Sequence, residues 1–404
     1  MYPLLYFILL FLYNQWVGMN VKRKEKIADS FELGPFRPPS EAYSLLIRAT
    51  RNCPWNRCRF CGMYKGQNFQ LRPVEDIKQD IEAMKNVRDS IMELSWRSGY
   101  GGRTKEVAAL VLNKPLNHAF YNIALWLYDG GQNAFLQDAN SLIMRTNELT
   151  EILRFLRGTF PDISRITSYG RSKTAAKKTL EELVEIHEAG LSRLHIGLES
   201  GSDRVLKFVD KGVSAAEHIK GGRKVVESGI SLSEYVLLGL GGKEMWREHA
   251  IETARVLNEI SPNFIRIRTL SLGERSPMYP DVLNGNFIRI TDEEMIEEEK
   301  LLIENLDCNS YYVSDHIANL LQEVEGGLPE NKEKMLAVID RFQSLRPEER
   351  TNFRIGRRAR IYTYLDELND SRRYKVVEQI VDKLSQGNHD IDEEVVHKMR
   401  EGFI

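Results

Sequence analysis

The sequence contains only four cysteines in 404 residues, whereas a framework of structural disulfides needs more of them, spread along the chain. Neither charge dominates, because 56 lysines and arginines face 58 aspartates and glutamates, so no global basic field attracts nucleic acid. The chain also lacks an apolar run of about 20 residues, which a membrane-spanning helix requires. Together with a hydrophobic content of 42%, these absences predict a globular, cytoplasmic protein without an integral membrane role.

The first 18 residues contain an unbroken apolar run from Tyr2 to Tyr13. This run is shorter than a bilayer-spanning helix, and it lacks the preceding positive charge and the following small residues of a signal peptide. Three interpretations stay open for residues 1–18: a non-native extension or tail ahead of a start at Met19, a weak membrane anchor, and an export signal.

Short strand-like runs alternate with helical stretches between residue 44 and about residue 280. The strand-like runs are 44–50, 133–137, 165–168, 193–198, 231–238 and 264–270, and the helical stretches are 73–95, 148–156, 175–188, 214–228 and 244–260. This alternation predicts an α/β fold of about six βα units with parallel strands, in an open doubly wound sheet or a partial barrel.

Beyond residue 285 the alternation stops. Charged amphipathic helices are predicted there, at 291–306, 329–343, 347–368 and 371–386. We therefore predict an N-terminal arm (1–43), an α/β domain (44–284) and a helical C-terminal extension (285–404).

Three of the four cysteines, Cys53, Cys58 and Cys61, form one short cluster with the spacing C-x4-C-x2-C. A plant-type ferredoxin shares the start of this pattern but needs a fourth cysteine nearby, and the next one is Cys308. A structural zinc site also wants four ligands, and the nearest histidine, His118, lies outside the loop. Three thiolates without a fourth predict an iron–sulfur cluster with one iron open for chemistry.

The cysteine loop resembles that of the radical S-adenosylmethionine (radical SAM) enzymes, in which an aromatic residue, here Phe60, precedes the third cysteine. The loop has one residue more than the usual C-x3-C-x2-C spacing. Residues 194–202 (LHIGLESGS) resemble the fourth-strand segment of the branch with Elongator-type, methylthiotransferase-type and anaerobic coproporphyrinogen-oxidase-type domains. Lys211-Gly212 follows at that branch's distance, and residues 238–242 (LGLGG) resemble its fifth-strand glycine turn.

The resemblance, which covers about residues 44–280, implies a partial (β/α)6 TIM-like barrel with a helical C-terminal extension. It implies that Cys53, Cys58 and Cys61 hold three irons of a [4Fe–4S] cluster whose fourth iron binds SAM. Reductive cleavage of SAM would then give methionine and a 5′-deoxyadenosyl radical, which abstracts hydrogen from an unknown substrate. A radical SAM oxidoreductase-like enzyme of this kind needs a low-potential electron donor such as ferredoxin or flavodoxin.

Several further residues are assigned to SAM by the same resemblance. Glu199 would accept hydrogen bonds from the SAM ribose, and Lys211 would face the SAM carboxylate. Asp138 and Asn140 stand where the family often has a Gly-Gly-Glu-like motif for the SAM amino group. Arg171 would meet a carboxylate of SAM or of the substrate. Helix caps, a solvated lysine and a rim arginine are the structural alternatives for these side chains.

Gly239 and Gly241 resemble a place where the backbone passes close to the methionine or adenine of SAM, although a turn at a strand end has the same composition. Arg266 and Arg268 alternate along the last predicted strand, where they line either a barrel lumen or an exposed edge. Cys308 is either a hydrogen-atom donor or a small core residue. The segment 311–316 is interpreted as an aromatic and polar cluster outside the barrel core.

Two other functions stay open. One is a cluster- or haem-handling chaperone without radical turnover, motivated by the missing Gly-Gly-Glu-like motif. The other is a plain electron-transfer iron–sulfur protein with Cys308 as a fourth ligand. The acidic C-terminal helices favour a small-molecule substrate over nucleic acid.

Overall fold

The computed structural model describes residues 31–112, 118–385 and 391–401. It is an α/β protein in which eight strands belong to a mostly parallel sheet, a partial TIM-like arrangement that confirms the predicted class. The chain forms two compact units. Of the described residues, the first unit contains 31–51, 71–112, 118–138 and 147–167, and the second contains 52–70, 139–146, 168–385 and 391–401. The predicted boundaries at residues 43/44 and 284/285 stay predictions.

The first unit pairs a buried strand with a long amphipathic helix. Strand β1 (Leu45–Arg48) runs parallel to β4 (Asn133–Gln137), with Leu46 opposite Phe135. The first-turn acids of α2 (Val74–Arg97), which follows Pro73, suit the positive end of a helix dipole. The other elements are α3 (Thr104–Leu112), α4 (His118–Tyr128), most of α5 (Thr146–Thr159), the short strand β2 (Thr50–Arg51) and the 3-10 turn η1 (Pro39–Glu41).

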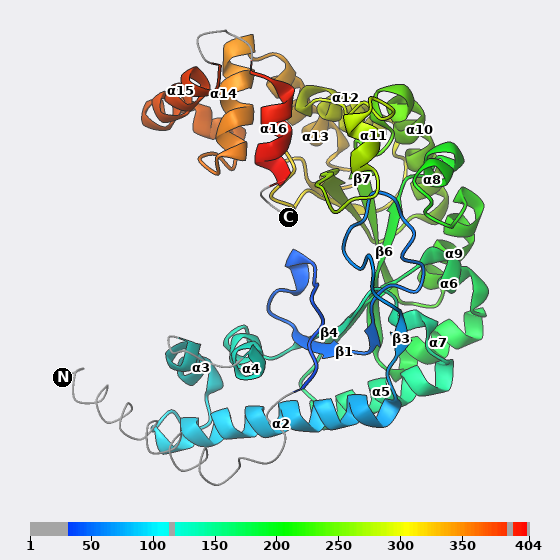
Figure 1. The fold of residues 1–404 in the computed structure, drawn as a ribbon. Coiled ribbons are helices and arrows are strands. Elements are labelled where there is room, and N and C mark those ends of the chain that lie inside the picture. The colour runs from blue at the N-terminus through cyan, green and yellow to red at the C-terminus, as the bar shows by residue number, and fades with distance from the viewer. Residues whose placement is uncertain (1–30, 113–117, 386–390, 402–404) are drawn as a thin grey trace, which may run out of the picture. The chain divides into compact units, whose positions relative to one another are not determined.

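The second unit contains most of the sheet. Strands β6 (Leu191–Glu199), β7 (Ser231–Leu238), β8 (Phe264–Thr269) and β9 (Tyr311–Val313) are parallel neighbours in that order, and β10 (Gly326–Gly327) is antiparallel to β9. The helices that connect β6, β7 and β8 are α8 (Asp203–Phe208), α9 (Ala215–Glu227) and α10 (Gly242–Ile260). Figure 1 shows these helices beside β6 and β7. Parallel strands place their carboxyl ends at one edge of a sheet, so the segments that follow them meet there.

Two predicted helices are each divided. Residues 175–188 were predicted as one helix, but α6 (Ser172–Lys177) ends before Thr179, whose side chain begins α7 (Leu180–Ala189) through a capping box with Glu182. The predicted helix 347–368 stops at the end of α14 (Pro347–Arg358), and the 3-10 turn η3 (Leu365–Asn369) follows.

Several elements were not predicted. Among them is strand β9, which pairs with β8 and lies within the segment 311–316 that was interpreted as a cluster outside the barrel core, and β10, α8 and α16 (Glu393–Glu401) were also missed. Each strand is too short to show a repeating pattern. The remaining elements are η2 (Ser141–Ile143), β3 (Gln70–Leu71), β5 (Arg165–Gly170), α11 (Tyr279–Leu283), α12 (Asp292–Asn305), α13 (Lys332–Gln343) and α15 (Ser371–Ser385).

Within the described ranges, no helix combines the length and hydrophobicity that crossing a membrane requires. The apolar segment 1–18, with its three interpretations, lies outside the described residues.

The helical part of the second unit contains a buried ionic cluster. The carboxylate of Asp292, at the start of α12, accepts hydrogen bonds from Arg358 of α14 at 2.6 and 3.1 Å and from Arg400 of α16 at 3.1 Å. All three side chains are at most 2% exposed. Three helices that are distant in sequence are therefore joined through one carboxylate.

Candidate functional site

The cysteine loop takes its shape from two asparagines in left-handed conformations. Asn52 has φ 65° and Asn56 has φ 48°, which asparagine tolerates better than most residues. The side-chain amide of Asn56 donates to the carbonyl oxygens of Tyr64 and Gln67, and its backbone N–H donates to the sulfur of Cys53 at 3.4 Å. The extra residue of the C-x4-C spacing is thus accommodated in a turn with internal hydrogen bonds.

The loop is fastened to the chain that follows α8. The N–H of Arg59 donates to the carbonyl of Val209 at 2.8 Å, and the indole N–H of Trp55 donates to the carbonyl of Asp210 at 2.7 Å. The side chain of Arg57 donates to the Asp210 carboxylate at 3.1 Å. These bonds place the cysteines beside the segment that leads into Lys211.

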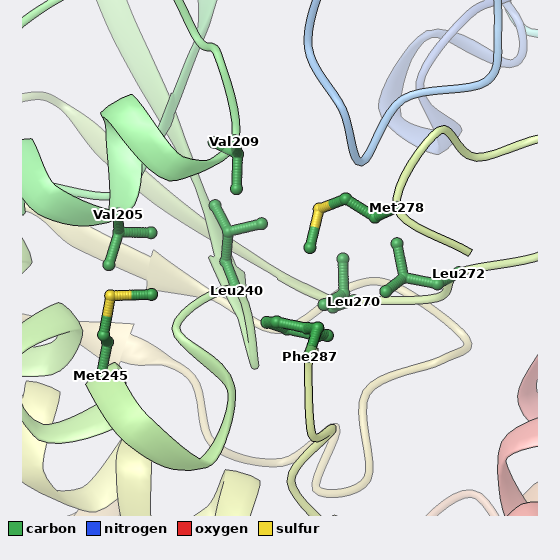
Figure 2. Close-up of a cluster of buried hydrophobic side chains, with 8 residues drawn as sticks. All are labelled: Val205, Val209, Leu240, Met245, Leu270, Leu272, Met278 and Phe287. Atoms are coloured by element: carbon green, nitrogen blue, oxygen red, sulfur yellow. The ribbon is translucent and has the colours of Figure 1, made fainter. Parts of the chain in front are cut away.

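Phe60, the aromatic residue before Cys61, packs against a buried apolar cluster. The eight cluster residues drawn in Figure 2 are Val205, Val209, Leu240, Met245, Leu270, Leu272, Met278 and Phe287. They come from α8, from the chain after β7 and from the chain after β8, so Phe60 ties the loop to the carboxyl ends of the strands. This packing orients the loop by apolar burial as well as by hydrogen bonds.

Glu199 and Lys211 form an ion pair at the end of β6. The ammonium of Lys211 lies 2.9 Å from Glu199 Oε1 and 5.7 Å from the centre of the Phe60 ring. Glu199 has φ 62°, just after a register shift in the pairing of β6 with β7. A Cβ at Gly197 would collide with the Glu199 carboxylate, so glycine there leaves the space that the pair occupies. A non-glycine residue at positive φ at a strand end is typical of a functional position.

The loop thiols and the charged groups lie close enough to affect one another's ionisation. Burial raises the pKa of Cys58, and the positive charges of Lys211 and Arg171 oppose that rise. Burial also raises the pKa of Cys61, and the neighbouring negative charges of Cys58 and Cys53 raise it further. Although burial lowers the pKa of Lys211, the charges of Glu199 and Cys58 raise it overall, so the lysine is charged near neutral pH.

Three mutually neighbouring thiols beside two cations fit an anionic thiolate-bound cluster, since a metal deprotonates its thiol ligands and the cations offset the negative charge. Among the residues that the structure describes, no three His, Cys, Asp or Glu side chains are grouped closely enough to hold a single metal ion.

Arg171 connects the loop to the end of the third predicted strand. Its guanidinium donates to the carbonyl of Lys211 at 2.7 Å and lies 5.2 Å from the ring of Trp55. Its backbone N–H donates to the side-chain oxygen of Asn140 at 3.1 Å, and the Asn140 amide donates to Thr174 at 2.9 Å. Asn140 therefore braces the start of α6 and Arg171 braces the start of the Lys211 segment.

A buried relay links Glu199 to the glycine turn after β7. His249 donates from Nε2 to the Glu199 carbonyl at 3.0 Å and from Nδ1 to Glu298 at 2.8 Å, and Glu298 accepts the N–H of Gly239 at 2.6 Å. Burial lowers the pKa of His249, but the charge of Glu298 raises it overall, in keeping with an imidazolium that donates from both nitrogens. Gly241 begins α10.

Asp138 belongs to the first unit, at the end of β4. Its side chain is fully buried, and its Oδ2 accepts hydrogen bonds from Arg48 Nε at 2.9 Å and Arg48 Nη2 at 2.7 Å. The predicted roles of Asp138, Asn140, Gly239 and Gly241 toward SAM stay predictions.

Cys308 lies at the opposite end of the strands from the cysteine loop. It precedes β9, and its sulfur lies 3.4 Å from the hydroxyl of Ser310. That hydroxyl donates a hydrogen bond to the carbonyl of Pro262, which lies two residues before the start of β8. The loop contacts segments that follow α8 and β8 instead. Because parallel strands separate their two ends by the strand length, about 3.3 Å for each residue, Cys308 is a buried core residue rather than a fourth ligand.

Sequence reasoning missed four residues that build this site: Trp55, Gly197, His249 and Glu298. Trp55 and Gly197 lie inside the two motifs that were compared with the family, so their positions in the sequence could have identified them as site residues. His249 and Glu298 lie on helices and reach the site only through the fold.

No protein-family model matches the chain, and no curated protein sequence matches it. Solved structures do align with it. The archaeal Methanocaldococcus infernus Elp3 is 14% identical over 59% of this chain and 61% of its own, with a TM-score of 0.41. TsrM, a radical S-adenosylmethionine methyltransferase from Kitasatospora setae, is 15% identical over 66% of this chain and 44% of its own, with a TM-score of 0.42.

Coproporphyrinogen III oxidase (HemN) from Escherichia coli is 14% identical over 60% of this chain and 51% of its own, with a TM-score of 0.37. The chain thus spans less than two thirds of the length of each of these three proteins. Of these aligned structures, TsrM and HemN are described as radical SAM enzymes.

Proposed function

We propose that this chain is a radical SAM enzyme, in which Cys53, Cys58 and Cys61 hold a [4Fe–4S] cluster beside a SAM site. One observation carries the proposal: the three-cysteine loop is fastened by Arg59 and Trp55 to the segment that contains Lys211. The loop, the Lys211–Glu199 pair and the carboxyl ends of the strands therefore share one place. A cluster in that loop, when bound, supplies the electron that divides SAM into methionine and a 5′-deoxyadenosyl radical.

The side chains around the loop are suited to hold SAM. The Glu199 carboxylate accepts hydrogen bonds from the ribose hydroxyls, and the charged Lys211 attracts the SAM carboxylate. Gly197 lets the Glu199 carboxylate lie over the strand, because a side chain at that position would collide with the carboxylate. The carbonyl of Glu199 is held by His249, which fixes the strained backbone from behind.

The electron donor and the substrate follow from the same proposal. A low-potential protein donor docks where the loop reaches the surface, and Arg57 and Met63 are exposed there. The formal charge of −2 for the chain favours a small-molecule substrate over nucleic acid.

Glu199→Ala is expected to weaken SAM binding by about 10-fold to 100-fold, because hydrogen bonds to a charged group contribute about 1.5–3 kcal/mol. Calorimetry with the purified full chain measures this, and iron content confirms that the cluster is retained. Glu252→Ala, which changes a half-buried glutamate on α10 that pairs with Arg255, serves as the matched control. Equal SAM affinity in the two variants would remove Glu199 from the site.

A further inference from the structure

The inner face of β6, β7 and β8 continues from the Glu199–Lys211 pair across two strands. Side chains alternate along a strand, and parallel partners point to the same face. Gly197 on β6 is paired with Tyr235 on β7, which is paired with Arg266 on β8. Arg268, two residues on, lies on the same face, whereas Ile265 and Ile267 point to the other side and are fully buried. The sequence left the orientation of both arginines open, and the structure places them together.

The two arginines converge on one acid. Arg266 Nη1 and Arg268 Nη1 each donate to the carboxylate of Asp315, the second at 2.8 Å. Arg268 also stacks over the ring of Tyr235 at 4.7 Å, and Arg266 lies 5.8 Å from the ring of Phe264. Guanidinium groups that aromatic rings and a carboxylate hold in place are preorganised to bind planar anions.

Asp315 neutralises only one of the two arginine charges and does not accept hydrogen bonds from all of their N–H groups. Two guanidinium charges less one carboxylate charge leave a net charge of +1, and burial together with Arg268 lowers the pKa of His316 to about 4, so that neighbour is neutral. Arg266 Nε and Arg268 Nη2 are buried and have no hydrogen-bond partner among the residues described. The Arg266 side chain is only 8% exposed. Unpaired buried N–H groups are rare because each one is destabilising, and a ligand is one way to pair them.

We propose that the arginine pair, Arg266 and Arg268, binds a carboxylate of the small-molecule substrate. This proposal rests on the proposed function, because it places the substrate on the same sheet face as the Glu199–Lys211 pair, at the next two strands. The charge of +1 becomes neutral when one carboxylate binds, and the fork geometry of arginine matches the two carboxylate oxygens. The rings of Tyr235 and Phe264 favour a substrate whose carboxylate is attached to a flat or apolar group.

The test uses benzoate as the probe, with benzamide as its neutral counterpart and phenyl phosphate as the alternative anion. Binding to the full chain without SAM is followed by ligand-observed NMR titration. We expect benzoate to bind and benzamide not to bind. Arg268→Met is expected to weaken benzoate binding by about 10-fold or more, and Arg268→Lys, which keeps the charge but not the fork, by less. Arg223→Met, which removes an exposed arginine paired with Glu259 on the helical layer, is expected to change nothing.

Equal binding of benzoate and benzamide, or full benzoate affinity in a folded Arg268→Met variant, would overturn the proposal. Binding of phenyl phosphate in place of benzoate would overturn the carboxylate assignment. Circular dichroism establishes that each variant is folded. SAM affinity is measured in parallel, so that the two proposals fail separately: normal SAM binding without benzoate binding removes only the carboxylate site, whereas benzoate binding without SAM binding contradicts the proposed function.

Discussion

Cys58→Ala is expected to reduce the iron content of anaerobically purified protein from one [4Fe–4S] cluster per chain to near background. The loop offers three thiolates and no more. Cys58 is the central one, and Cys53, Cys61 and Lys211 are its neighbours. With two thiolates left, the remaining ligands no longer hold a cluster that is already open at one iron. Iron quantification and the visible absorption of the cluster measure the loss.

The matched control is Cys308→Ala, which removes the one cysteine outside the loop. Cys308 is buried just before β9, and its sulfur is hydrogen-bonded to Ser310. Its replacement is therefore expected to leave the iron content unchanged and to lower the stability only slightly, through the small cavity that it creates. Iron loss in both variants to the same degree would contradict the three-cysteine assignment and favour a cluster with four protein thiolates.

Asp292→Asn is expected to lower the free energy of unfolding by about 3–5 kcal/mol, because it leaves the buried guanidinium groups of Arg358 and Arg400 without a counter-charge. The amide keeps the shape of the side chain, so the loss reports charge rather than volume. Chemical denaturation measures it. Asp340→Asn is the control, since Asp340 is 58% exposed in its pair with Lys300 and such pairs contribute about 1 kcal/mol or less. Equal destabilisation in the two variants would contradict this account of the cluster.

The same cluster makes stability depend on pH. Burial raises the pKa of Asp292, but the charges of Arg358 and Arg400 lower it well below its usual range. A lowered folded-state pKa contributes stability above the unfolded-state value of about 3.9 and loses it as the pH falls below that value. Wild-type stability is therefore expected to decline below about pH 4 more steeply than that of Asp292→Asn.

The parallel strands were predictable because each is a compact apolar run between helical stretches. The runs 133–137 and 231–238 match β4 and β7 residue for residue. The pattern failed where elements are short or where one side chain breaks a helix. Thr179 divides a predicted helix through its capping box, and β9 has only three residues, too few for any periodicity to show.

The candidate site was predictable only where it is local in sequence. The cysteines and the Glu199 motif could be compared with a family, and the structure places the loop beside the Lys211–Glu199 pair. The support behind them was not predictable, because His249 and Glu298 are 49 residues apart and meet only through the packing of α10 on α12. The direction of Arg266 and Arg268 also depended on strand register, which the sequence leaves open.

The most direct test of the account is whether the reconstituted protein cleaves SAM reductively. The full chain, loaded with iron and sulfide under anaerobic conditions and reduced with dithionite, is incubated with SAM, and 5′-deoxyadenosine is quantified. We expect 5′-deoxyadenosine well above the level produced by the Cys58→Ala variant treated in the same way. An intact cluster with no product above that level would contradict this expectation and would favour a cluster- or haem-handling role for this chain.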